Sequence, residues 1–367
     1  MANQTPNLLE KVKGFFKALS KQQLIAIIAA VVAIAVLIPV IILIPNGNNK
    51  PEETTPATTT PATTTPAATT PEATTPDNIP DNTPVEKTYT VAIAVDSTSS
   101  VSRGKAKATN MALVLVLDEA GKIVAARFDT SEVTPELNED GTVKTVDSVA
   151  TKVEQGDAYT GMTAGSWADQ TKAFENFLIG KTPAEVAALD TSAESVKGET
   201  PLVAGCTMTS SVPQFQALVA EAAASTLKVT FKTTEAITVG LAIDTTVTTG
   251  RSNKVTADFA GVVIAGGKVV ATVLDSSEQS FTVEEGAITF GEFKGTKNER
   301  GDNYTGMAAG PWYKQAQVFA NSTVGKTVAE LADLEVVSDA LAAAGCTMEN
   351  TTAGYKTTII AAAGYAR

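Results

Sequence analysis

The longest apolar stretch of the chain runs from Leu24 to Pro45 and contains 22 residues without a charged side chain. A helix rises about 1.5 Å per residue, so a run of this length matches a hydrocarbon core roughly 30 Å thick. Its interior Pro39 would break a helix in water, but a membrane span tolerates it as a kink. The pattern therefore predicts one transmembrane helix over residues 24–45.

Lysines are concentrated on the N-terminal side of this run. Only Lys50 follows it closely, and Glu52 and Glu53 come soon after that lysine. By the positive-inside rule, residues 1–23 form a basic cytoplasmic tail, and the chain beyond Pro45 is extracytoplasmic. The run is longer than the core of a cleaved signal peptide, about 7–15 residues, and no small-x-small site follows it. We therefore expect a single-pass signal anchor in the cell membrane, preceded by Lys11, Lys13, Lys17 and Lys21.

Residues 46–87 show no hydrophobic periodicity and are rich in Thr, Pro and Ala. Such a segment cannot bury a core, and its prolines favour an extended polyproline II conformation. At about 3.1 Å per residue, the stretch from Pro51 to Pro84 would reach roughly 100 Å. We expect a stalk, for which O-glycosylation and a plain disordered linker are equally compatible. Its regularly spaced prolines are Pro51, Pro56, Pro61, Pro66, Pro71 and Pro76.

Beyond the stalk, the hydrophobic pattern is first that of strands. Thr90–Val95 and Met111–Leu117 are rich in apolar and β-branched residues. A turn around Gly121 joins the second of these segments to Lys122–Phe128 as a hairpin.

Helical spacing follows the hairpin. Ser166 and Asp169 resemble a capping box, and a helix from there is expected to end at Gly180. Thr182–Glu185 has the cap, the N1 proline and the N3 glutamate of a second, short helix. A third is expected over Val212–Ala224. The apolar face of the first consists of Trp167, Thr171, Phe174 and Leu178.

An internal duplication is the strongest signal after the apolar run. TKVEQGDAYTGMTAGSW at 151–167 aligns with TKNERGDNYTGMAAGPW at 296–312 at 12 of 17 positions. Unrelated segments of that length would share about one residue. The further matches pair 90–96 with 238–244, 121–129 with 267–275, 180–189 with 325–334, and 204–208 with 344–348.

The duplication predicts two tandem homologous domains, a first repeat over 88–226 and a second over 227–367. Each is expected to be α+β, a small antiparallel sheet with covering helices. The copies cease to align at 130–150 and 276–295, so structural differences should concentrate there.

Composition narrows the functional classes. Residues 88–367 hold 22 Lys and Arg against 33 Asp and Glu, a net charge of −11, which disfavours nucleic acid and anionic lipid as partners of this part. The chain contains no histidine, which argues against Ser-His hydrolases and zinc enzymes. No spacing of carboxylates indicates a glycosidase. Cys206 and Cys346 occupy equivalent loops and are expected to be free thiols. An enzymatic role is not favoured.

Two glycine-containing loops precede helices in each repeat. In the first repeat they are 157–167 and 204–211, and either loop has the residue types of an anion site at a helix N-terminus. For 157–167, turn formation and capping explain the same residues and are favoured.

The second loop carries a family resemblance. Three segments resemble the FMN-binding domain family: GKIVAARFD at 121–129, the pair Phe174 and Phe177 followed by Gly180-Lys181, and AGCTMTSS at 204–211 before an amphipathic helix. That family includes flavin-carrying subunits of sodium-pumping and Rnf-type respiratory complexes. Its Ser-Gly-Ala-Thr-x-Thr loop can receive FMN through a phosphoester bond on the last threonine.

The resemblance implies an FMN site in the first repeat. Thr209 falls on the acceptor position, while Ala204 and Cys206 replace the serine and the alanine of the family loop. Hydroxyl groups beside Thr209 would add to an anion site at the helix N-terminus. The implied cofactor-binding residues are Gly205, Thr207, Thr209, Ser210 and Ser211.

The second repeat departs from the family loop. Gly345 and Thr347 persist, but Glu349 occupies the acceptor position, where its carboxylate would repel a phosphate. We therefore expect a surface-tethered flavin electron carrier or small-ligand module that acts with a redox partner. The alternative is a structural or adhesive component of the cell envelope without a cofactor.

Overall fold

The computed structural model describes residues 84–367 apart from 103–104, 160–161, 163, 305–306 and 308. The predicted tail, the predicted transmembrane helix and the stalk up to residue 83 lie outside the described residues. Within the described part of the chain, no helix is both long enough and apolar enough to cross a membrane.

The first sheet has three long strands and one short one. Its order is β3-β2-β1-β4, and all neighbouring strands are antiparallel. β1 and β2 pair from Tyr89↔Asp118 to Ser102↔Lys105 and form a long hairpin. The strands are β1 (Lys87–Ser102), β2 (Lys105–Asp118), β3 (Ile123–Val133) and β4 (Val229–Thr233).

Helices cover one face of this sheet. Phe128 of β3 stacks on Phe215 of α7 with ring centroids 4.2 Å apart, and Phe174 of α4 packs beside both rings. The covering elements are α3 (Lys152–Gln155), η1 (Gly156–Ala158), α4 (Trp167–Leu178), α5 (Pro183–Ala187), α6 (Ala193–Lys197) and α7 (Ser211–Ala224).

The helix starts follow from local hydrogen bonding, as predicted. The Ser166 side chain accepts from the Asp169 N–H at the start of α4. Thr182 and Glu185 form a complete capping box, with Pro183 at the first helical position of α5.

The second half repeats the three long strands and the helices after them, but its fourth strand precedes the helices and pairs with the third long strand instead of the first. Its sheet has the order β5-β6-β7-β8, again antiparallel. The strands are β5 (Ile237–Thr248), β6 (Asn253–Ala265), β7 (Lys268–Glu284) and β8 (Ala287–Phe290). The helices are α8 (Lys297–Arg300), η2 (Gly301–Asn303), α9 (Trp312–Asn321), η3 (Glu330–Asp333), α10 (Asp339–Ala343) and α11 (Glu349–Gly364).

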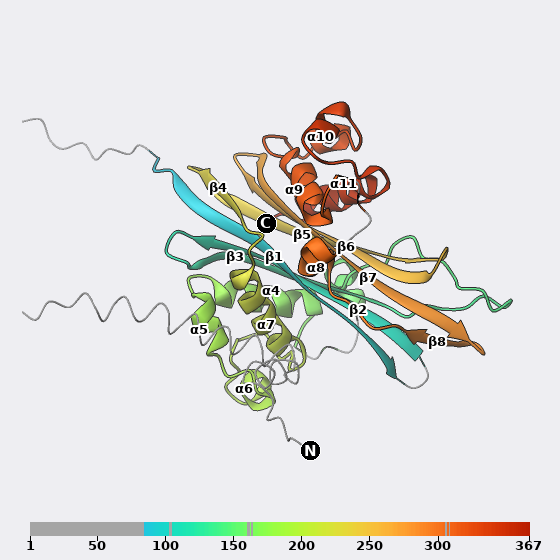
Figure 1. Ribbon diagram of the computed structural model, residues 1–367. Coiled ribbons are helices and arrows are strands. Elements are labelled where there is room, and N and C mark those ends of the chain that lie inside the picture. The colour runs from blue at the N-terminus through green and yellow to red at the C-terminus, as the bar shows by residue number, and fades with distance from the viewer. Residues whose placement is uncertain (1–83, 103–104, 160–161, 163, 305–306, 308) are drawn as a thin grey trace, which may run out of the picture.

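The two sheets pack face to face and share one hydrophobic core. Helices α4, α5 and α7 lie on the outer side of one sheet, and α9, α10 and α11 lie on the outer side of the other (Figure 1). Each sheet is therefore buried on both faces, in a helix–sheet–sheet–helix arrangement. The shared core includes Val91, Val95 and Val114 from the first sheet and Val239, Phe259 and Val273 from the second.

An approximate two-fold relation between the halves explains one glycine. Val114 and Gly261 occupy equivalent positions, and they meet across the interface between the sheets. A Cβ atom added to Gly261 would lie 2.4 Å from Cγ2 of Val114, so two valines cannot face each other here. The register pairs that fix the equivalence are Ala94↔Leu113 and Ala242↔Ala260.

The predicted α+β class is confirmed, with two antiparallel sheets and helices. The strands are longer than predicted, because they continue through small polar residues such as Ser97 and Asn110 that hydrogen-bond to each other at 2.9 Å. The strand β4 lies beyond the predicted boundary at 226/227 and completes the sheet of the first repeat by pairing with β1.

The repeats differ in the regions where their sequences cease to align. In the first repeat, residues 134–150 are irregular and join the second sheet through the bridge Val146↔Val247. In the second repeat, β7 continues to Glu284, and β8 returns alongside it.

Candidate functional site

The loop that resembles a flavin site is a tight turn before α7. Gly205 adopts φ +81°, which favours glycine, and the Cys206 N–H donates to the Val203 carbonyl at 3.1 Å. The side chains of Cys206 and Met208 point into the core of the first repeat. Both cysteines are free and buried, as predicted, and burial raises the pKa of the Cys206 thiol.

Buried Gln170 connects the two glycine-containing loops. Its Oε1 atom accepts from the Thr207 N–H at 2.8 Å and from the Thr207 hydroxyl at 3.1 Å. Its Nε2 atom donates to the Gly165 carbonyl at 3.1 Å. The Thr207 hydroxyl, one of the predicted cofactor groups, is thus engaged within the protein.

The second repeat has the same connection. Gln315 accepts from the Thr347 N–H at 2.9 Å and donates to the Gly310 carbonyl at 2.9 Å. Because the bonds are identical in a repeat whose acceptor position is Glu349, they do not depend on a phosphate site. They hold the loop against α4 in one repeat and against α9 in the other.

The N-terminus of α7 offers fewer free donors than the sequence suggested. The N–H groups of Ser211 and Val212 donate to the Met208 carbonyl at 3.1 and 3.0 Å. The next residue, Pro213, has no N–H. Thr209 is half-buried and Ser210 is exposed, so these hydroxyls remain near the surface.

In the second repeat, the corresponding helix begins at the acceptor position itself. Glu349 is the first residue of α11, whereas α7 begins two residues later, at Ser211. A carboxylate in the first turn is favourable to the helix dipole. Glu349 therefore has a local structural role.

The first loop surrounds a buried lysine in each repeat. The Nζ atom of Lys152 lies 4.9 Å from the centre of the Tyr159 ring and 5.7 Å from that of Trp167, and it forms an ion pair with Glu132 at 3.0 Å. Lys297 lies 5.3 Å from the Tyr304 ring in the same way. These contacts fit the core-packing interpretation of the loop. Sequence reasoning missed the lysines, although both occupy the matched TK-x-E segment.

Two further buried carboxyls were missed. Asp129 accepts from the N–H groups of Thr130 at 2.7 Å and Val153 at 3.2 Å, and Asp275 accepts from those of Ser276 at 2.7 Å and Asn298 at 3.0 Å. Burial raises the pKa of both carboxyls to about 7. Each joins its strand to a short helix, and the matched sequence segments that end in these aspartates were the available signal.

In the second repeat, a buried carboxyl lies between sheet and helices at a position where the first repeat has an apolar residue. Burial raises the pKa of Asp258. The charge of Lys297 and the hydroxyls of Ser276 and Tyr355 partly offset this rise. Among the described residues, the Asp258 Oδ1 atom and the hydroxyls of Ser276 and Tyr355 have no hydrogen-bond partner with good geometry. The first repeat has Met111 at the position of Asp258, within its hydrophobic core.

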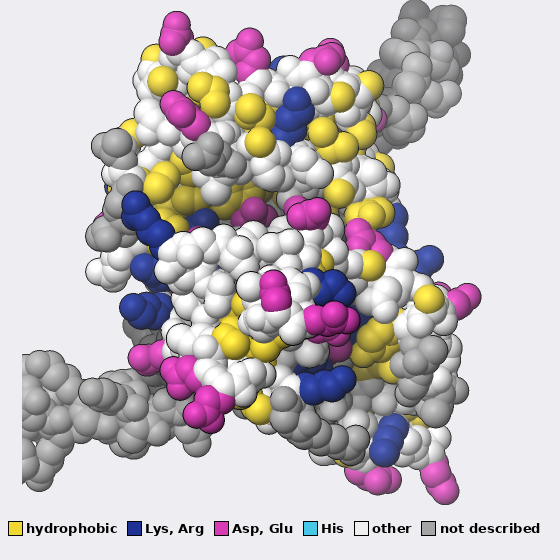
Figure 2. Space-filling view, turned by 90° about the vertical axis from the view of Figure 1, so that its right-hand side faces the viewer, with side chains coloured by type: hydrophobic (Ala, Val, Ile, Leu, Met, Phe, Trp, Pro, Cys, Tyr) yellow, Lys and Arg dark blue, Asp and Glu magenta, His cyan; other side chains and the backbone are white. Residues whose placement is uncertain are grey.

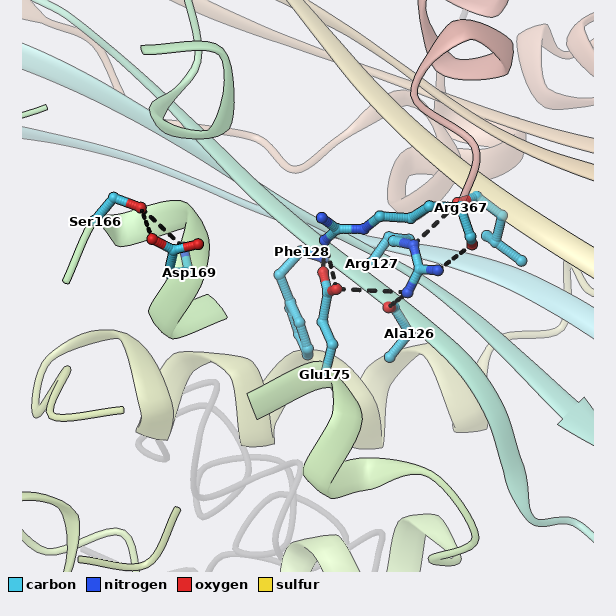
Figure 3. Close-up of polar contacts among 8 residues, drawn as sticks. Ala126, Arg127, Phe128, Ser166, Asp169, Glu175 and Arg367 are labelled. Atoms are coloured by element: carbon cyan, nitrogen blue, oxygen red, sulfur yellow. Dashed lines mark hydrogen bonds and ion pairs between the residues drawn. The ribbon is translucent and has the colours of Figure 1, made fainter. Parts of the chain in front are cut away.

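A buried ion cluster is centred on Glu175 of the first repeat and includes Arg367 from the end of the second (Figure 3). Glu175 of α4 lies 3.4 Å from Arg127 Nη1 and 2.7 Å from Arg367 Nη2, and its Oε1 atom accepts from the Phe128 N–H at 2.9 Å. Arg127 also donates to the Val239 carbonyl at 3.0 Å, which connects β3 to β5. Burial raises the pKa of Glu175, and the two arginines act against that rise.

Comparisons with known proteins leave the site to be judged on its geometry. No family model, no curated protein and no solved structure matches the chain. Among the described residues, no group of three or more His, Cys, Asp or Glu side chains could hold a metal ion.

Proposed function

We propose that this chain is a non-catalytic component of the cell envelope, in which the two repeats act as one rigid body outside the cytoplasm. The stalk and the predicted transmembrane helix tether that body to the cell membrane as a single-pass protein. The two repeats are the tandem homologous domains that the duplication predicts.

The observation that supports this proposal most is the use of polar groups in the two glycine-containing loops. Gln170 and Gln315 engage the equivalent threonines, Thr207 and Thr347, through the same bonds. The repeated residues that would suggest a site are therefore accounted for by the fold itself.

Contacts between the repeats add to this support. The sheets share a core, the Arg127 guanidinium reaches the Val239 carbonyl, and the Tyr365 hydroxyl donates to Glu154 at 2.8 Å. A body joined in this way resists relative motion of its halves. On the face drawn in Figure 2, acidic, basic and hydrophobic side chains are interspersed. Mixed charge of this kind suits an exposed surface.

A flavin carrier is the second candidate, and the position of Thr209 favours it. Its half-buried side chain lies beside exposed Ser210 before a 14-residue helix. With the Ser211 and Val212 N–H groups already engaged, the loop suits a phosphoester on Thr209 better than a backbone cradle for a free phosphate. FMN attached there would supply electron transfer to a redox partner.

One experiment separates the two candidates. Residues 84–367 are exported from cells that also express an FMN transferase, and the purified protein is examined for flavin absorbance and for an FMN mass adduct. A colourless, unmodified protein that also fails to bind free FMN supports the structural function. An adduct lost in Thr209→Ala and kept in the control Thr347→Ala, which changes a threonine of the corresponding loop in the second repeat, would replace it with the flavin carrier.

The orientation has its own test. Protease added to intact cells should release a fragment containing both repeats, because the lysines flank the N-terminal side of the predicted span. Retention of both repeats by the treated cells would contradict an extracytoplasmic location.

A further inference from the structure

A groove of about 470 Å³ lies between the two repeats. Ile93 of β1 and Leu227 line one side, and Val273 and Leu274 of β7 and Val318 of α9 line the other. The volume falls within the roughly 300–1,000 Å³ typical of small-molecule sites, which are also mainly apolar. The groove is distant in sequence from the loop at 204–211 and shares no residue with it.

The equivalent place in the other half of the molecule is filled. By the approximate two-fold relation it lies between β5 and the pair formed by β3 and α4. Arg127 spans it to reach the Val239 carbonyl, Glu175 balances the guanidinium charge, and Arg367 closes it by pairing with Glu175 at 2.7 Å. Figure 3 shows these side chains converging at the edge of the two sheets.

Three replacements explain why the groove is open. The aligned repeats place Val273 where the first repeat has Arg127, and Ala320 where it has Glu175. Continuing the alignment of the last helices, Leu227 stands at the position of Arg367. All three charged side chains of the filled site thus correspond to apolar ones, two of them much smaller. Val273 and Leu227 line the groove, whereas Ala320 does not, so the change removes the charged group that fills the other site and leaves apolar side chains in the lining.

The rim of the groove is positive. Lys228 and Lys314 line it, and no aspartate or glutamate is among its described lining residues; the Lys228 Nζ atom also donates to the Ala223 carbonyl. Both lysines are exposed, and Lys314 stands where the first repeat has Asp169. In a chain whose net charge is −12, this rim attracts an anion and disfavours a cation. An apolar floor beneath two ammonium groups is complementary to an amphipathic anion with one charged end.

We propose that the groove between the repeats binds a medium-chain aliphatic carboxylate. Its hydrocarbon chain lies on Val273, Leu227 and Ile93, and its carboxylate faces Lys314 and Lys228. Asn298 and Gln317 also line the groove; their amide nitrogens donate to the Leu274 carbonyl and to Asn321 Oδ1, both at 2.8 Å, so each retains one N–H for a carboxylate oxygen.

Binding is measured by calorimetry on residues 84–367, which bury their hydrophobic clusters among themselves. The probe is decanoate, below its micellar concentration, with hexanoate and octanoate as shorter homologues. Each added methylene should tighten binding roughly fourfold, since it buries about 0.8 kcal/mol of transfer free energy. Decylammonium should bind at least tenfold more weakly than decanoate. Equal binding of the two, or no binding of decanoate, overturns the proposal.

Variants locate the site. Val273→Arg combined with Ala320→Glu rebuilds the ion pair of the first repeat inside the groove and should abolish decanoate binding. Leu227→Arg is a second variant that fills the groove. It is used if the double variant shows no cooperative unfolding transition and is therefore not folded. Lys314→Glu should weaken decanoate binding about tenfold. Lys172→Glu makes the same charge change at an exposed residue of α4 and should leave binding unchanged. Undiminished binding in a folded filling variant overturns the assignment.

Discussion

Between sheet and helices, the first repeat has Met111 and Phe215, whereas the second repeat has Asp258 and Tyr355 at the same two positions. At the edge where the sheets meet, the first repeat has a buried ion cluster and the second has an open apolar groove. In both places, neighbouring residues differ together. Contacting residues have coupled energies, so a change at one position alters what its neighbour can be.

The parts that do not differ teach the complementary lesson. Both repeats retain the capping box before the first short helix, at Thr151 and Thr296, and the glutamine that engages the loop threonine. These residues satisfy backbone groups that would otherwise be buried without a partner. The residues that are identical in the two repeats are therefore those that satisfy backbone hydrogen bonds of the shared fold.

The largest expected effect tests the ion cluster. Glu175→Ala leaves the Arg127 guanidinium partly buried without its carboxylate, and it leaves the Phe128 N–H without its acceptor. Breaking a buried pair in this way costs about 3–5 kcal/mol, measured as the loss in free energy of unfolding in urea. The second repeat tolerates alanine at the equivalent position, Ala320, because no arginine faces it there.

The control for this prediction replaces Arg127 and Glu175 by the residues that the second repeat has at these positions, valine and alanine. Arg127→Val combined with Glu175→Ala should recover part of the loss, while the unsatisfied Phe128 N–H still costs about 1–3 kcal/mol. A double variant no more stable than Glu175→Ala alone would show that charge burial is not the cause.

The second prediction concerns the packing of the sheets. Gly261→Val places a side chain within 2.4 Å of Val114 and should lower the free energy of unfolding by about 1–3 kcal/mol through overpacking. Exchanging the pair, as Val114→Gly with Gly261→Val, should restore part of the stability, because it removes the contact with Val114 but leaves the added Cβ 2.8 Å from Cγ2 of Val273. Urea unfolding of the three proteins measures both effects, and equal instability of the single and double variants contradicts this packing explanation.

The sequence predicted local features better than this packing. The predicted caps at Ser166 and Thr182 depend on residues three positions apart, so such pairs can be read directly along the chain. The packing of one sheet on the other depends on contacts between residues more than 100 positions apart, such as Arg127 and Val239. A signal was present, since near-continuous apolar strands such as β2 are typical of sheets covered on both faces.

The candidate site was predicted less completely than the fold. The residues around Thr207 do lie together, but the acceptor that engages this threonine, Gln170, is 37 positions away and was not anticipated. The groove was not predicted either, because it depends on the absence of a large charged side chain at the lining residue Val273, and pattern reasoning does not detect an absence.

A third prediction uses pH to separate the repeats. Burial raises the pKa of Asp129 and Asp275 to about 7, and it also raises that of Asp258, which occurs only in the second repeat. Between pH 4 and 7 the unfolded carboxyls are ionised while folded Asp129 and Asp275 still hold protons, and the raised pKa of Asp258 acts in the same direction. Unfolding then releases protons, so these groups make the free energy of unfolding fall as pH rises through that window.

The matched variants sharpen this comparison. Asp258→Met with Tyr355→Phe gives the second repeat apolar residues at both positions, as in the first, and should flatten the fall in stability between pH 4 and 7. Asp129→Asn should flatten the fall by the contribution of the Asp129 carboxyl alone, while its counterpart Asp275 remains. The fold should tolerate this change, since an amide oxygen still accepts from the Thr130 N–H. Chemical denaturation at a series of pH values gives both slopes, and slopes equal to that of the unmodified protein contradict the assignment.

The smallest expected effect concerns the second capping box of each repeat. The Thr182 hydroxyl accepts from the Glu185 N–H at 3.2 Å, and the Thr327 hydroxyl accepts from the Glu330 N–H at 3.3 Å. Only the first repeat has a proline next, Pro183, and only there does the box open an α-helix rather than a 3₁₀ turn. Replacing either threonine by alanine should cost about 1 kcal/mol.

The proline should make the two costs unequal. Pro183 already has the backbone φ that the first helical position requires, so α5 retains part of its start when Thr182→Ala removes the cap. The second repeat has Val328 there and depends on the cap alone, so Thr327→Ala should lower the melting temperature more than Thr182→Ala. Adding Val328→Pro to Thr327→Ala should recover a few tenths of a kcal/mol, because proline also restricts the unfolded chain. Equal losses for the two threonines would mean that tertiary packing, and not the first helical turn, sets the stability of both segments.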